Sequence, residues 1–219
     1  MKKALILTLC LLFAGCGSPK PVPDWLSTSH NQLEGYKNNY LSGDEKRAAS
    51  QLKGALSEIK KTGDLPLLAR AHLIRMALET VVMEDLTDGE YLKIDDLGPD
   101  RQNRNFYLFL KGDAAKVDEK FLPDQYQGIF RSIKRGASAD YVKEIDKMED
   151  PLSRLIAIGV MVRIRQDNEA LMEKAIDTAS AQGWKKALLV YLGRLKEYYL
   201  KKGEKEKALG IEGRIKLIH

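Results

Sequence analysis

Apolar residues from Asp24 to the C-terminus recur mainly three or four positions apart, which is the spacing of one helix face. Few runs alternate with the period of two that marks a half-buried strand, and β-branched residues do not cluster. Alanine, leucine, lysine and glutamate, which all favour helices, are frequent throughout. The pattern therefore predicts a single all-α domain over residues 24–219.

The boundaries of these helices are marked by glycine followed by an acidic residue, at Gly43-Asp44, Gly63-Asp64, Gly112-Asp113 and Gly203-Glu204. Glycine accepts the left-handed conformation that ends a helix, and the acid caps or begins the next one. Asp150 followed by Pro151 is a further helix start. Together the signals predict helices over residues 24–41, 44–61, 65–84, 99–111, 114–121, 124–134, 139–149, 151–166, 168–182, 184–202 and 204–218.

The turns between most of these helices are short, so neighbouring helices should pack antiparallel as hairpins. The last hairpin resembles the tetratricopeptide repeat in the spacing of Leu192, Leu195, Tyr199, Gly203 and Ala208. The hairpin around Gly43 resembles it at fewer positions. This resemblance implies a TPR-like α-solenoid with a concave surface for peptides or partner proteins, and an irregular helical array is the alternative.

One predicted helix, over residues 151–166, carries apolar residues on nearly every side. A helix that is apolar all round is normally buried, and Gly159 within it would let a neighbouring helix approach closely. We therefore expect the region from about Asp124 onward to hold the best-packed part of the core.

The first sixteen residues follow a different pattern. Lys2 and Lys3 precede an apolar run over residues 4–13, which is too short to span a hydrocarbon layer about 30 Å thick. A signal peptide over residues 1–15 is the better interpretation. The ending Ala14-Gly15-Cys16 resembles the lipobox of bacterial lipoproteins, which implies cleavage between Gly15 and Cys16 and attachment of acyl chains to Cys16.

Residues 16–23 form a proline-rich tether, with prolines at positions 19, 21 and 23. Alternate prolines favour an extended conformation, which would span roughly 20 Å at about 3.1 Å per residue. The lipoprotein resemblance implies a bacterial membrane as partner through lipidated Cys16. Gly17, in the position where aspartate retains enterobacterial lipoproteins in the inner membrane, implies the periplasmic face of the outer membrane of a Gram-negative bacterium.

Charge and cysteine content exclude several classes of function. The net charge of +5 includes Lys2 and Lys3, and acidic residues are interleaved with the remaining basic ones, so nucleic acid is not an expected partner. Cys10 lies in the signal peptide and Cys16 would carry lipid, which leaves no thiol for redox chemistry. The three histidines lack metal-ligand spacing, and no cofactor is expected.

The candidate binding site is an acidic stretch over residues 84–100, which lacks the helical pattern. It suits a loop that binds a basic partner, because long irregular segments in compact domains are often functional. Its departures from the EF-hand pattern argue against calcium. The candidate residues are Asp85, Asp88, Glu90, Asp95 and Asp96.

No catalytic motif emerges. The sequence around Ser138 comes near the hydrolase elbow, but it follows a predicted helix where the motif needs a strand. The leading hypothesis is a non-catalytic, membrane-anchored envelope lipoprotein that acts as a protein-interaction scaffold or assembly factor, with an envelope protein as partner. A peptidoglycan-associated enzyme or enzyme regulator is the first alternative, and a small-ligand or lipid carrier is the second.

Overall fold

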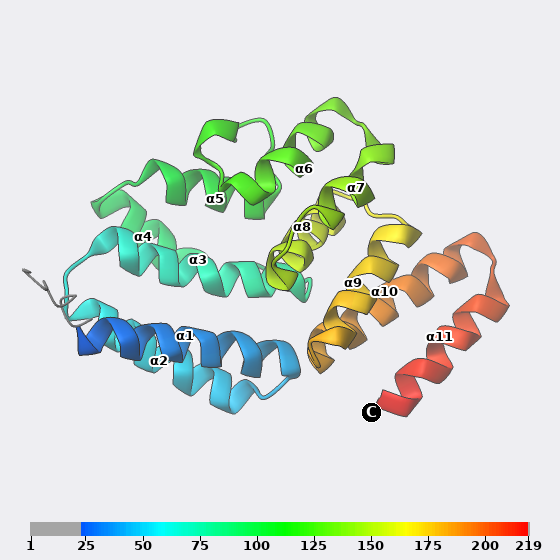
Figure 1. Ribbon diagram of the computed structural model, residues 1–219, viewed down its shortest axis with the longest axis horizontal. Helices are drawn as coiled ribbons and strands as arrows, with labels where there is room; N and C mark the ends of the chain where they lie inside the picture. Colours follow the sequence, from blue (N-terminus) through cyan, green and yellow to red (C-terminus); the bar gives the residue numbers. More distant parts are fainter. Residues whose placement is uncertain (1–22, 219) are drawn as a thin grey trace, which may run out of the picture.

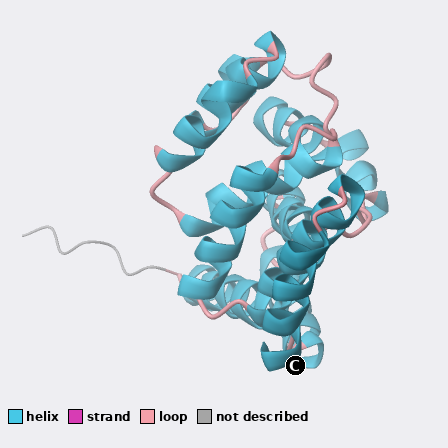
Figure 2. Ribbon diagram, turned by 90° about the vertical axis from the view of Figure 1, so that its right-hand side faces the viewer, coloured by secondary structure: helices cyan, strands magenta, loops and turns pink. Residues whose placement is uncertain are grey.

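The computed structural model describes residues 23–218, and this part of the chain is helical, with no β-strand (Figures 1 and 2). The prediction of an all-α domain is confirmed. The elements, in chain order, are α1 (Asp24–Ser42), α2 (Glu45–Lys60), α3 (Leu65–Val81), α4 (Gly89–Leu97), α5 (Arg101–Lys111), the short 3₁₀ turn η1 (Glu119–Phe121), α6 (Asp124–Arg135), η2 (Ser138–Asp140), α7 (Tyr141–Asp146), α8 (Pro151–Arg163), α9 (Glu169–Ala181), α10 (Lys185–Lys202) and α11 (Lys205–Ile218).

Most helix ends follow the predicted glycine and acid signals. Gly43 ends α1 with a left-handed φ of 94°, and the Asp44 carboxylate caps α2 by accepting a hydrogen bond from the Arg47 amide at 3.1 Å. Asp150 caps α8 in the same way, with the Ser153 amide donating at 2.8 Å. These caps satisfy amides that the helix itself leaves unpaired.

Three predicted segments are wrong. The stretch 84–100 is not one irregular loop, because it contains α4, which buries Tyr91 and Ile94 and packs against α3. The segment 114–121 is helical only in η1, since the Asp118 amide donates instead to Asn105 Oδ1 at 2.7 Å. The segment 139–149 is divided between η2 and the short α7.

Helices α3 and α8 lie at the centre of the molecule and contact each other, although about 70 residues separate them in the sequence (Figure 1). Helix α1 likewise contacts α10. In a solenoid each repeat contacts only its sequence neighbours, so these contacts describe an irregular helical array. Antiparallel hairpins remain the local unit, as in α1–α2 and α10–α11.

The expectation for α8 is confirmed. Eight of its residues are buried, and they face every side of the helix: Ser153, Leu155, Ile156, Ala157, Ile158, Gly159, Val160 and Met161. Helices α3, α5, α6, α7 and α9 all pack around it. Between Pro23 and Ile218, no helix is both long and apolar enough to cross a membrane.

Candidate functional site

The predicted lipid attachment lies outside the described residues. Gly15 and Cys16 precede Pro23, where the described part of the chain begins. Cleavage at Gly15 and acylation of Cys16 therefore stay predictions from the sequence.

The acidic candidates do not form one loop with a shared surface. Asp88 lies at the start of α4, where its carboxylate accepts hydrogen bonds from the Tyr107 hydroxyl at 2.9 Å and from Lys111 Nζ at 3.2 Å. Burial by itself would raise the pKa of Asp88, but these two hydrogen bonds outweigh it and hold the pKa below its ordinary value. Asp88 therefore stabilises the packing of the start of α4 against α5.

Two further candidates are also engaged within the chain. Asp95 is only 3% exposed, and its carboxylate lies 2.5 Å from the Arg104 guanidinium. Glu90 pairs with Lys93 at 2.7 Å on the surface of α4, and the hydrogen bond from Lys93 lowers the pKa of Glu90. The carboxylates of Asp88, Glu90 and Asp95 therefore have partners already. Asp85 and Asp96 are exposed, and neither carboxylate pairs with a cation among the described residues.

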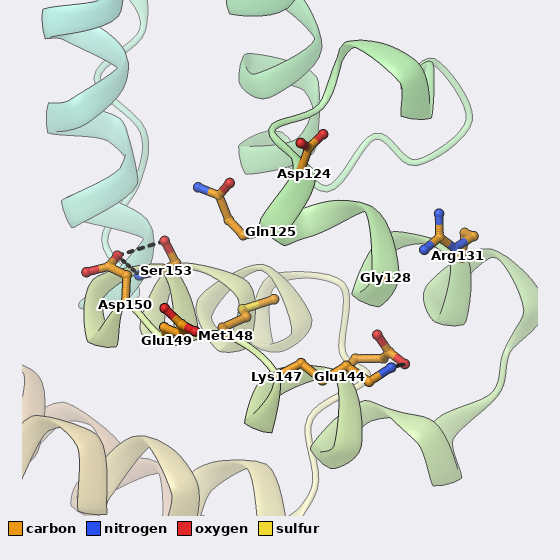
Figure 3. Close-up of a pocket in the computed structure, with 10 residues that line it drawn as sticks. All are labelled: Asp124, Gln125, Gly128, Arg131, Glu144, Lys147, Met148, Glu149, Asp150 and Ser153. Atoms are coloured by element: carbon orange, nitrogen blue, oxygen red, sulfur yellow. Dashed lines mark hydrogen bonds and ion pairs between the residues drawn. The ribbon is translucent and has the colours of Figure 1, made fainter.

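A different set of residues forms a pocket of about 600 Å³ where α6, α7 and the start of α8 meet (Figure 3). Its walls come from α6, from α7, from residues 147–150 between α7 and α8, and from the first turn of α8. Four of the lining residues carry a carboxylate. The lining residues are Asp124, Gln125, Gly128, Arg131, Glu144, Lys147, Met148, Glu149, Asp150 and Ser153.

The absence of a side chain at Gly128 shapes the floor of this pocket. A Cβ atom placed there would overlap the Glu144 carboxylate, so glycine in α6 leaves the room that Glu144 of α7 occupies. Glu144 also pairs with Lys147 at 2.7 Å. A side chain at position 128 would therefore displace the flexible end of Glu144 from this part of the pocket.

The pocket carries an excess of negative charge, with four carboxylates against Arg131 and Lys147. Both cations have other partners, since Arg131 pairs with Glu119 outside the pocket and Lys147 pairs with Glu144. Asp150 is committed to capping α8. Asp124 and Glu149, by contrast, make no ion pair within 4.0 Å to any described residue.

A second polar cluster joins distant parts of the chain. Lys186, at the start of α10, lies 2.8 Å from Glu84 and 3.3 Å from Glu45, and its Nζ is 4.4 Å from the centre of the Tyr40 ring. The Tyr40 hydroxyl donates to Glu84 as well. The cluster holds the N-terminal hairpin against α10, which is a structural role.

Sequence reasoning missed both the pocket and the Lys186 cluster. The pocket residues are spread over residues 124–153 without a motif, and the cluster joins positions more than 100 residues apart. In the described range, no group of three His, Cys, Asp or Glu side chains could hold a metal ion.

Comparisons with protein-family models, with curated proteins and with solved structures found no match to this chain.

Proposed function

We propose that this protein is a lipid-anchored bacterial envelope protein whose helical body holds a partner protein, with a lysine or arginine side chain of the partner in the pocket between α6 and α8. The anchor rests on the lipobox-like sequence ending at Cys16. Gly17 favours the outer membrane.

The pocket is the observation that supports a binding role. It is concave, it holds more carboxylates than cations, and Asp124 and Glu149 have no cation of their own among the described residues. A long basic side chain fits such a site, because its apolar stem covers Met148 while its charge reaches the rim. Ion pairs in a partly enclosed pocket are also stronger than on open surface.

The two alternatives have less support. The cavity with an entirely apolar lining, which includes Phe109, Val117 and Val160, has room for about 10 Å³, far less than an acyl chain needs. A larger hollow of about 440 Å³ beside Leu52 and Leu56 of α2 lies open at the surface and would not enclose a chain. A glycosidase needs a carboxylic acid with a raised pKa. The carboxyl groups whose pKa departs from its ordinary value all shift downward, because hydrogen bonds from lysine and tyrosine side chains outweigh burial: Glu84, Asp88, Glu90, Glu169 and Glu212.

The anchor is tested by fractionation of cells that produce the wild-type protein or Cys16→Ala. We expect the wild type in the outer-membrane fraction, with a mass that includes diacylglycerol, and the variant outside it. A Cys16→Ala protein that stays in the membrane would show that the anchor lies elsewhere.

The binding role is tested by crosslinking in cells followed by affinity purification. Glu149→Lys places a cation at the rim, and Gly128→Met fills the floor of the pocket. We expect both to reduce recovery of the crosslinked partner at least tenfold. The matched control is Asp177→Lys on the exposed face of α9, which should leave recovery unchanged. Equal recovery with all three variants would place the partner on another surface.

A further inference from the structure

Five helix ends lie together at the end of the molecule where the tether joins the body. Helices α1 and α2 are antiparallel, as their contacts show: a Cβ at Gly35 would lie 3.0 Å from Gln51, and one at Gly54 would lie 2.5 Å from Gln32. The start of α1 is therefore beside the end of α2. In Figure 1 this is the left-hand end, where the dark blue start of α1 lies.

Helices α3, α4 and α5 contribute to the same end. Asn103 in the first turn of α5 donates to the Pro66 carbonyl in the first turn of α3, at 2.9 Å. Gly98, which follows α4, lies so close to Leu65 that an added Cβ would be 3.0 Å from its Cδ1. We call this surface, formed by the starts of α1, α3 and α5 and the ends of α2 and α4, the tether end.

The tether end exposes apolar side chains that nothing in the described chain covers. Leu97 is 76% exposed and Leu26 is 40% exposed. Trp25 beside Leu26 is half-buried, and Pro66 and Pro99 are exposed. Exposed leucines also occur in α10 and α11, so exposure alone does not identify what the tether end meets; the two possible occupants are a membrane and another protein.

The length of the tether decides between these occupants. Seven peptide steps separate Cys16 from Pro23, so the chain between them can span no more than about 25 Å. If Cys16 carries lipid, the tether end must remain within that distance of the bilayer surface. A second protein would have to fit into the same narrow gap, whereas the bilayer is always present there.

We propose that the tether end rests on the lipid surface, with Leu97 and Leu26 inserted at the level of the lipid headgroups. This proposal depends on the lipid anchor at Cys16. Two leucines alone would bind a bilayer weakly, but the anchor makes their insertion an intramolecular event. The contact is apolar in origin, because Lys60 and Arg101 at this end are offset by Asp24 and Asp64.

The orientation has a consequence for the proposed function. The pocket is lined by residues of α6, α7 and the start of α8, and these helices lie away from the left-hand end of the molecule in Figure 1. With the tether end on the bilayer, the pocket stays accessible from the periplasm.

The test uses the intact lipidated protein in vesicles of phosphatidylethanolamine and phosphatidylglycerol. The mature chain has no cysteine other than Cys16, so Leu97→Cys introduces one free thiol for an environment-sensitive fluorophore. The matched control is Leu209→Cys in α11, which is 65% exposed on another part of the molecule. On binding to vesicles, we expect the fluorescence emission of the label at position 97 to shift to shorter wavelength. Spin-labelled lipid should quench this emission several-fold more than the emission of the label at position 209.

A second pair of variants tests the apolar contact itself. Here the fluorophore is attached to Lys60→Cys, and this protein is compared with one in which both Leu26 and Leu97 are also replaced by serine. The serine replacements should abolish most of the quenching by spin-labelled lipid. High salt should leave the quenching unchanged.

The two proposals fail in different ways. Protein that sediments with the vesicles but shows equal quenching at positions 97 and 209 would overturn the docking of the tether end while the anchor stands. Protein whose measured mass lacks diacylglycerol would overturn the anchor, and the docking proposal with it.

Discussion

Gly159 in α8 lies so close to Thr80 in α3 that a Cβ atom at position 159 would be 2.5 Å from the Thr80 carbonyl oxygen. The obstacle is backbone, which cannot move aside as the end of a side chain can. Gly159 therefore sets the distance between the two central helices, and the sequence prediction of a close approach at this position is confirmed.

The first prediction is that Gly159→Ala lowers the free energy of unfolding by about 1–3 kcal/mol, because the added methyl forces α3 and α8 apart. The measurement is urea denaturation followed by circular dichroism. Gly193→Ala is the matched control, since a Cβ there meets no atom within 4 Å in the middle of α10. Alanine has a higher helix propensity than glycine, so this control substitution should raise the free energy of unfolding by up to about 1 kcal/mol. Equal effects from the two substitutions would refute the close packing.

The second prediction separates the two neighbouring aspartates of α4. Asp95→Asn removes the charge that pairs with Arg104 and should lower the free energy of unfolding by about 1–2 kcal/mol. Asp96→Asn, on the exposed face, should change it by less than about 0.5 kcal/mol. A larger effect from Asp96→Asn in denaturation experiments would contradict the assignment of Asp95 as the structural member.

The third prediction concerns Lys186. Burial lowers its pKa, but the hydrogen bond and charge of Glu84 outweigh this and raise the pKa above its ordinary value. Lys186→Met should lower the free energy of unfolding by up to about 1 kcal/mol, because it leaves the Glu84 carboxylate, whose side chain is 45% exposed, without its cation. Lys185→Met, at the exposed neighbouring position, is the control and should have no measurable effect.

The same cluster predicts a dependence on pH. Burial would raise the pKa of Glu84, but hydrogen bonds from Lys186 and Tyr40 hold it below its ordinary value. The stabilisation is therefore present above the unfolded pKa of about 4.3 and disappears as the pH falls through the lower, folded value. The stability difference between wild type and Lys186→Met should shrink on acidification. A difference that grows would contradict this assignment.

The fourth prediction concerns His72, which is buried in α3. Burial, aided by the charge of Arg75, lowers the pKa of His72 to about 4, and Glu90 opposes the shift only in part. The unfolded chain, with a pKa near 6.5, binds the proton more readily, so stability falls as the pH drops from about 6.5 to about 4.

The measurement for His72 is the urea midpoint across this pH range. His72→Leu should remove most of the slope, whereas His30→Gln in the exposed part of α1 should retain it. A wild-type midpoint that stays constant between pH 4 and 6.5 would show that His72 takes up a proton in the folded protein without penalty.

The sequence predicted most of the helices, because their ends depend on local chemistry. A cap such as Asp150 reaches an amide only three residues away, and a left-handed glycine such as Gly43 acts on its own turn. Both signals hold whatever surrounds the helix. The buried character of α8 was predictable for a similar reason, since its apolar residues leave no side for water.

The element types in 84–100 and 114–121 were not predictable in this way. Helix α4 has weak local signals, and its Tyr91 gains burial and a ring contact of 4.8 Å with Tyr107 only after α3 and α5 have packed. In 114–121, Asn105 takes the Asp118 amide that a helix would have used. In both segments, a tertiary contact outweighed the local preference.

The sequence by itself determined the class of the fold, the ends of most helices and the expectation of a lipid anchor at Cys16, because each depends on residues adjacent in the chain. Only the tertiary structure decided that α3 meets α8, that Asp88 and Asp95 are engaged within the chain, and that Asp124 and Glu149 share a pocket. The residues in each of these relationships belong to different helices or to the turns beside them, so the spacing of residues along one helix does not predict that they meet. They come together only when several helices pack against one another.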